Sequence, residues 1–155
     1  MPPVFIPMSD KDAAHYRAGG RDANGQKPER RISDGDGVPC RHSLRLLPKG
    51  TPYLIVGHRP FDGLNPYTET GPIFLAAEPT DRAPTSTDLP ETMSAPSYIV
   101  RGYDDDKRII YGTGCVVETP LITSHCAALL GRADVAFVHI RSASNNCFTV
   151  RVERG

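Results

Sequence analysis

Three groups of side chains in this sequence have residue types that could do chemistry. The first is Pro39-Cys40-Arg41-His42-Ser43, where a cysteine stands beside two basic residues. Because nearby positive charge favours the thiolate, Cys40 is a candidate nucleophile or redox thiol with His42 as its base. In an extended segment His42 shares the face of Cys40, whereas Arg41 lies on the other face. A buried structural cysteine and a metal ligand are the alternatives for Cys40.

The second and third groups are basic residues on predicted strands. His139 and Arg141 share one face of an otherwise apolar stretch, and Arg101 lies in another apolar stretch. A buried guanidinium needs an acid, carbonyl groups or a ligand, because its desolvation is costly. Arg101 and Arg141 are therefore a candidate anion-binding pair, since guanidinium forks match carboxylates and phosphates. The alternatives are surface exposure and ion pairs with an acid of the same chain, such as Glu118 or Glu153.

The remaining cysteines differ in their surroundings. Cys147 follows Asn145-Asn146, a pair typical of tight turns, and is a second candidate nucleophile with His139 as base. Cys115 and Cys126 lie in apolar contexts and are predicted core residues. The chain has no Walker-type phosphate loop, dinucleotide fingerprint, nucleophile elbow or paired-cysteine zinc motif. We therefore predict no cofactor and no metal site.

Hydrophobic patterns predict the elements that carry these residues. Thr119-Pro120 and Gly131 bracket a helix, with Thr119 as the N-cap and Ile122, Cys126 and Leu130 on one apolar face. A shorter helix is predicted after a Ser9 or Asp10 cap. Strands are predicted over residues 4–8, 53–58, 71–76, 98–103, 108–118, 135–142 and 147–153. This order predicts an α+β fold: a mainly antiparallel β-sheet, flat or strongly curved, with one main helix packed on it.

Segments outside these elements divide into two kinds. Residues 59–70 form a long loop whose Phe61, Leu64 and Tyr67 can pack, which is typical of binding loops. Residues 9–37 and 78–97 are rich in turn-forming and polar residues, and we expect them to be irregular or mobile. The length of 155 residues predicts a single domain over residues 1–155.

Composition excludes several classes of function. Eighteen basic residues balance 18 acidic ones, so no net charge attracts nucleic acid or an anionic membrane. No apolar run approaches the roughly 18 residues of a membrane span. The first residues lack the basic and apolar regions of an export signal, so we expect a cytoplasmic protein whose four cysteines are thiols.

Several short segments together resemble a known family. They are Pro39-Cys40-Arg41, Pro66-Tyr67, Gly71-Pro72-Ile73-Phe74, Arg101-Gly102-Tyr103-Asp104, His139-Ile140-Arg141 and Asn146-Cys147-Phe148. In this order and spacing, from about Phe5 to Arg154, the chain resembles a bacterial family catalogued only as domain of unknown function 1203. The resemblance implies no activity, cofactor or catalytic residue. Relatives often carry glycine before the late cysteine, where this chain has Asn146.

The leading functional hypothesis is a domain that binds a small molecule or anion. Its pocket is predicted at one end of the sheet, lined by Tyr67, Arg101, His139 and Arg141 and flanked by Cys40 and Cys147. One alternative is an enzyme that uses Cys40 or Cys147 as nucleophile and His42 or His139 as base. The other is a protein-interaction module or a homodimer formed through an open edge strand.

Overall fold

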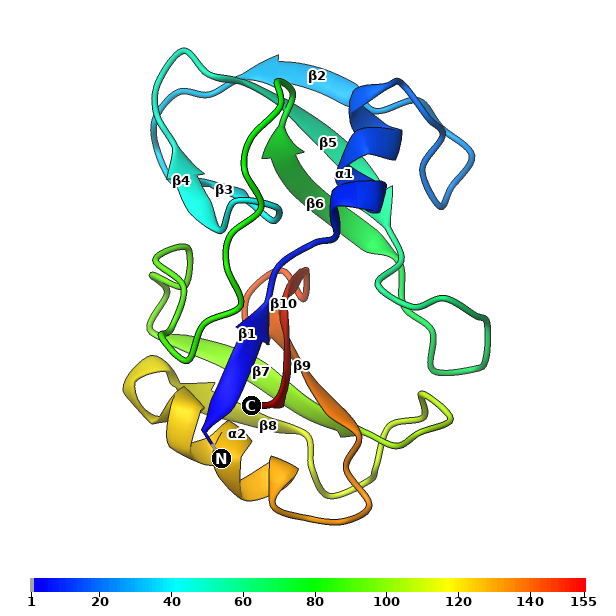
Figure 1. The fold of residues 1–155 in the computed structure, drawn as a ribbon, viewed down its shortest axis with the longest axis vertical. Coiled ribbons are helices and arrows are strands. Elements are labelled where there is room, and N and C mark those ends of the chain that lie inside the picture. Colours follow the sequence, from blue (N-terminus) through cyan, green and yellow to red (C-terminus); the bar gives the residue numbers. More distant parts are fainter. Residues whose placement is uncertain (1) are drawn as a thin grey trace.

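Two groups of antiparallel strands, each covered by one helix, make up the chain (Figure 1). The computed structural model describes residues 2–155. The large sheet has the strand order β1 (Pro3–Ile6), β10 (Phe148–Arg154), β9 (Phe137–Ser142), β7 (Ser97–Tyr103) and β8 (Cys115–Glu118). The small sheet consists of β2 (Glu29–Ile32), β5 (Pro52–His58) and β6 (Gly71–Ala76), while β3 (Val38–Cys40) pairs with β4 (Arg45–Leu47). The predicted α+β class is confirmed.

The main helix covers one face of the large sheet. It begins with a 3-10 turn, η1 (Thr119–Leu121), and continues as α2 (Ile122–Leu130). Ile122, Cys126 and Leu130 are buried in a core that includes residues of β7, β9 and β10, as the apolar periodicity predicted. The predicted Thr119 cap is wrong, because its hydroxyl donates to the Ala95 carbonyl and leaves the helix without a side-chain cap.

The second helix, α1 (Asp10–Arg17), covers the small sheet. Ser9 caps it as predicted, accepting a hydrogen bond of 3.1 Å from the Asp12 amide. Ala13 and Tyr16 are buried with the strand residues of β5 and β6. Within residues 9–37, therefore, the chain forms both α1 and β2.

The uncovered face of the large sheet carries polar and aromatic side chains. Here Arg101 pairs in register with His139, and His139 with Arg151. Simple alternation along β10 would place Phe148 on the face of Val150 and Val152. A register shift between Phe148 and Val150 breaks this alternation. A bulge inserts one residue and so moves Phe148 to the face of His139.

Two long connections lie between these elements. The strand predicted over residues 108–118 begins only at Cys115, because Gly112 takes a left-handed backbone (φ 91°) and the Thr113 hydroxyl accepts the Gly102 amide at 3.0 Å. The connection from β6 to β7 runs from the small sheet to the large one (Figure 1) and holds a single isolated bridge, between Ser86 and Phe5. No helix within residues 2–155 is long and apolar enough to span a membrane.

Candidate functional site

A cleft of about 710 Å³ lies where α1 and the end of β5 face the polar side of the large sheet. Its lining includes rings from both halves of the molecule: Tyr16, His58, Phe61, His139 and Phe148. We call these five residues the aromatic wall. The ring centroids of successive neighbours, from Tyr16 through His58, Phe148 and His139 to Phe61, are 5.8, 6.3, 4.9 and 5.0 Å apart.

His139 is the most unusual member of the wall. It is 0% exposed, and its ring lies 4.9–5.1 Å from the rings of Phe148, Phe61, Phe137 and Tyr103. Neither ring nitrogen has a hydrogen-bond partner among residues 2–155. Burial, followed by the charges of nearby arginines, lowers the pKa of His139 well below its usual value. The neutral ring therefore has one donor and one acceptor to satisfy, and the residue lines the cleft.

Tyr16 and His58 form the second polar pair of the wall. The Tyr16 hydroxyl shares a hydrogen bond of 2.8 Å with Nδ1 of His58. Burial raises the pKa of Tyr16 to about 12 and lowers the pKa of His58, so both side chains are uncharged near neutral pH. This pair links α1 to β5 and leaves Nε2 of His58 without a hydrogen bond from the described chain.

The cleft carries a small excess of positive charge. Its lining holds five cations and four carboxylates: Arg21, Arg59, Arg82, Lys107 and Arg151 against Asp12, Asp22, Asp62 and Glu153. Arg151 lies over the Phe137 ring, 3.9 Å from its centroid, and pairs with Glu153 at 3.2 Å. Within the described chain the Arg59 side chain donates only to the Phe61 carbonyl, at 3.4 Å, and to no carboxylate.

Arg101 and Arg141 do converge, but on an acid of the same chain. Both guanidinium groups pair with the Glu69 carboxylate, and Arg141 is only 4% exposed. The Asn146 side-chain oxygen accepts from Nε of Arg141 at 3.0 Å and from Arg101 at 3.3 Å. The intramolecular alternative therefore describes this pair, and the acid is Glu69. The network attaches the 59–70 loop to the large sheet.

The other predicted binding and nucleophilic residues lie apart from the cleft. The Tyr67 hydroxyl is 2.9 Å from that of Tyr111, and the Arg108 guanidinium lies over the Tyr67 ring. Cys40 is fully buried, and its sulfur accepts the Ala76 amide at 3.3 Å. Cys147 is half-buried and contacts the Asn145 carbonyl at 3.7 Å. Among the described residues neither sulfur hydrogen-bonds to a histidine.

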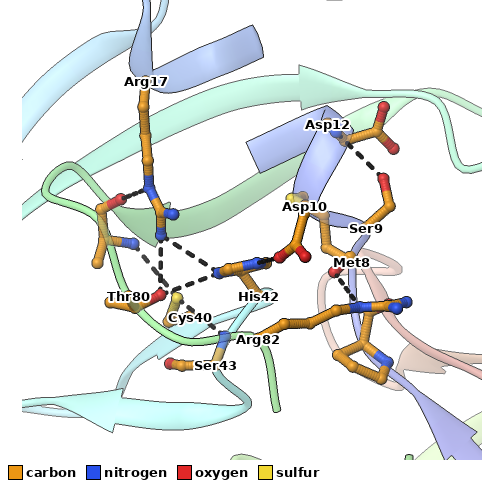
Figure 2. Close-up of polar contacts among 12 residues, drawn as sticks. Met8, Ser9, Asp10, Asp12, Arg17, Cys40, His42, Ser43, Thr80 and Arg82 are labelled. Atoms are coloured by element: carbon orange, nitrogen blue, oxygen red, sulfur yellow. Dashed lines mark hydrogen bonds and ion pairs between the residues drawn. The ribbon is translucent and has the colours of Figure 1, made fainter. Parts of the chain in front are cut away.

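His42 has polar partners on both ring nitrogens. Nε2 lies 2.7 Å from Asp10 Oδ1, and Nδ1 lies 2.9 Å from the Thr80 hydroxyl (Figure 2). Sequence reasoning missed Asp10 and Thr80 because they come from segments far from His42. It also missed Tyr16, His58 and Arg151, although the placement of Tyr16 on the apolar face of α1 was a usable signal. Within residues 2–155 no three His, Cys, Asp or Glu side chains are grouped so as to hold a metal ion.

The fold and the cleft define an α+β protein with a five-stranded sheet, two smaller antiparallel sheets and a cleft lined by aromatic rings. A family model described as "Protein of unknown function (DUF1203)" matches residues 37–154, and the chain belongs to this family. The predicted resemblance is thereby confirmed, and the match leaves β1, α1 and β2 outside it. No curated protein and no solved structure matches the chain.

Proposed function

We propose that the cleft binds a small aromatic molecule carrying one negative charge. The observation that carries this proposal is the His139 imidazole, buried and unpaired among the described residues at the cleft. Buried polar groups are nearly always hydrogen-bonded, so an orphaned imidazole favours a partner that enters from outside the chain. A carboxylate oxygen of such a ligand could accept a hydrogen bond from the N–H group of the neutral imidazole.

The aromatic wall favours a planar ligand. Its rings meet at edge-on or tilted angles, between 48° and 78°, so they present both ring faces and ring edges to the cleft. Aromatic pairs of this kind contribute about 0.5–1.5 kcal/mol beyond the burial of area. An aliphatic acid of similar size would lose this contribution.

The charged lining favours an anion over a neutral molecule. Arg59 directs no hydrogen bond to a carboxylate within the described chain and lies close enough to Tyr16 to affect its pKa. A guanidinium is a natural partner for a carboxylate because its N–H groups can bind two oxygens together. One net positive charge in the lining matches one negative charge on the ligand.

Benzoate is the probe that tests this function. We expect it to raise the melting temperature and to shift the imidazole NMR signals of His139, whereas benzamide and acetate act weakly. Benzamide keeps the ring without the charge, and acetate keeps the charge without the ring. No benzoate shift at His139 at millimolar concentrations, or equal shifts with acetate, would contradict the proposal.

Two variants locate the site. His139→Phe keeps an aromatic ring in the wall and removes both ring nitrogens, so it should abolish the benzoate effect on melting temperature. His125→Gln is the matched control, because His125 lies beside β8 and lines a different hollow. Equal benzoate stabilisation of both variants would remove His139 from the site.

We also infer a cytoplasmic location. All four cysteines are free, and Cys115 is exposed, which suits a reducing compartment. Fractionation of cells that express the protein from its own gene tests this inference. Recovery of the protein outside the cytoplasm would overturn it.

A further inference from the structure

His42 stands between an acid and a hydroxyl beside α1, outside the lining of the cleft. The imidazole is 1% exposed, while the Asp10 side chain that binds it is 80% exposed. The three residues come from the start of α1, the turn between β3 and β4, and the segment after β6. Figure 2 shows the His42 imidazole between Asp10 and Thr80, with Arg17 from the other end of α1 contacting both Thr80 and His42.

The chemistry of the partners sets the direction of every hydrogen bond in this group. The Asp10 carboxylate only accepts, so Nε2 of His42 carries the proton and donates at 2.7 Å. Nδ1 is then an acceptor, and the Thr80 hydroxyl donates to it at 2.9 Å. Arg17 only donates, and its NH2 group binds the Thr80 oxygen at 2.9 Å and, more weakly, Nδ1 of His42 at 3.5 Å. The Thr80 oxygen therefore faces a base for its proton and a cation for its developing charge.

We propose that Thr80 is a catalytic nucleophile that accepts an acyl group from an ester. Oγ of Thr80 attacks the ester carbonyl carbon, and its proton passes to Nδ1 of His42. As the carbon–oxygen bond to the leaving alcohol breaks, His42 returns that proton to the departing oxygen. Water then cleaves the acyl-threonine with the same base, releasing the carboxylic acid. Asp10 orients the imidazole and stabilises its charged form, as the acid of a hydrolase triad does.

The surroundings hold these groups in place, and a hollow lies beside their chain neighbours. Nε of Arg17 donates to the Ala76 carbonyl at 3.0 Å, and the Ala83 amide donates to the His42 carbonyl at 3.0 Å. A hollow of about 470 Å³ begins at Ser43 and Asp81, the chain neighbours of His42 and Thr80. Phe5, Leu44 and Leu89 make part of its lining apolar, which suits an apolar acyl chain. The lining also holds charged side chains, namely Arg45, Asp81, Arg82, Asp88 and Glu91.

This site is separate from the cleft. None of Asp10, Arg17, His42 and Thr80 lines the cleft around His139. The thiol of Cys40, the nucleophile suggested by the sequence, accepts backbone amides of Ala76 and Ser43 instead of meeting His42. A protein that fails to bind benzoate in the cleft could therefore still react at Thr80. A protein that fails to react at Thr80 could likewise still bind benzoate.

A fluorophosphonate probe tests the proposal on the full chain. The Thr80 oxygen would form a bond to phosphorus while fluoride leaves, and peptide mapping by mass spectrometry would place the adduct on Thr80. Thr80→Val should abolish the adduct, whereas Thr80→Ser should keep it. Thr85→Val is the matched control, because Thr85 is an exposed threonine of the same segment.

The rate of labelling separates catalysis from a structural role. His42→Gln should slow the labelling of Thr80 about 100-fold, the usual contribution of a general base. Asp10→Asn tests the same relay at an exposed side chain, so it should fold normally and label more slowly. The folded state of each variant is checked by its melting curve. A wild-type protein without an adduct on Thr80, or an Asp10→Asn protein labelled at the wild-type rate, would overturn the proposal.

Discussion

The Phe148 ring stands edge-on to the His139 imidazole, with 4.9 Å between the two ring centroids and 68° between the ring planes. This contact depends on the bulge between Phe148 and Val150, which places Phe148 on the polar face of the large sheet. The centroid of the Phe148 ring also lies 6.3 Å from the centroid of the His58 ring, which belongs to the small sheet. One inserted residue thus makes the aromatic wall continuous between the two halves of the molecule.

Replacement of Glu69 by glutamine should destabilise the protein. Both Arg101 and Arg141 pair with this carboxylate, so the variant leaves two guanidinium groups without their acid. We expect a loss of about 3 kcal/mol in the free energy of unfolding, the low end for a broken buried pair because Glu69 is partly exposed. Urea denaturation of the wild-type protein and the variant measures this difference in the free energy of unfolding.

The control for that variant is Glu78→Gln. Glu78 pairs with Arg30 at 3.2 Å on the surface, where both side chains are more than half exposed. Such pairs contribute less than about 1 kcal/mol. Equal losses in the two variants would show that the Glu69 network is no stronger than a surface ion pair.

Asn146 should tolerate glycine better than alanine. Its backbone is left-handed, with φ of 60°, and its side chain accepts hydrogen bonds from Arg141 and Arg101. Both variants lose these hydrogen bonds, but only alanine also places a Cβ in the left-handed conformation. Asn146→Ala should therefore be about 1 kcal/mol less stable than Asn146→Gly in thermal or urea unfolding. Equal stabilities of the two variants would show that the left-handed backbone at position 146 does not matter for stability. The same left-handed turn is the reason to expect glycine at this place in relatives.

Stability should fall as the pH drops below about 6.5, the ordinary pKa of histidine. The folded protein keeps His139 neutral because its pKa is lowered, so below this pH the unfolded chain binds a proton that the folded chain does not. His58 acts in the same direction. Each histidine contributes a slope of at most about 1.4 kcal/mol per pH unit.

Urea denaturation between pH 7.5 and 5.5 measures this dependence. His139→Phe should weaken the loss of stability at low pH without removing it, since His58 remains. An unchanged pH dependence in the variant would mean that His139 titrates in the folded protein as it does in the unfolded one.

The four thiols should react in an order set by exposure. Cys115 is exposed and should be alkylated first in the native protein, followed by half-buried Cys147. Cys40 and Cys126 are 0% exposed and should react only on unfolding, and burial raises the pKa of Cys126 to about 12. Alkylation with iodoacetamide followed by peptide mass spectrometry gives the order. Fast native reaction of Cys40 would instead support the cysteine-dependent enzyme.

The sequence alone determined where the two helices and most of the strands lie, although it did not predict β2, β3 and β4. Short, largely apolar runs marked β5, β6 and β9, and the apolar stripe of Ile122, Cys126 and Leu130 marked α2, because these patterns depend on residues close together in the chain. The same local logic identified Arg101, His139 and Arg141 as side chains in need of partners. It also found His42, but as a base for Cys40.

Only the tertiary structure decided which partners those side chains have. Glu69 meets Arg141 across 72 residues, and Thr80 meets His42 across 38, distances over which no periodicity carries information. The bulge beside Phe148 likewise depends on pairing between β9 and β10 and changes which side chains share a face. Sequence patterns report the burial of each residue in its own element, whereas a site is made by groups that meet only when the elements pack.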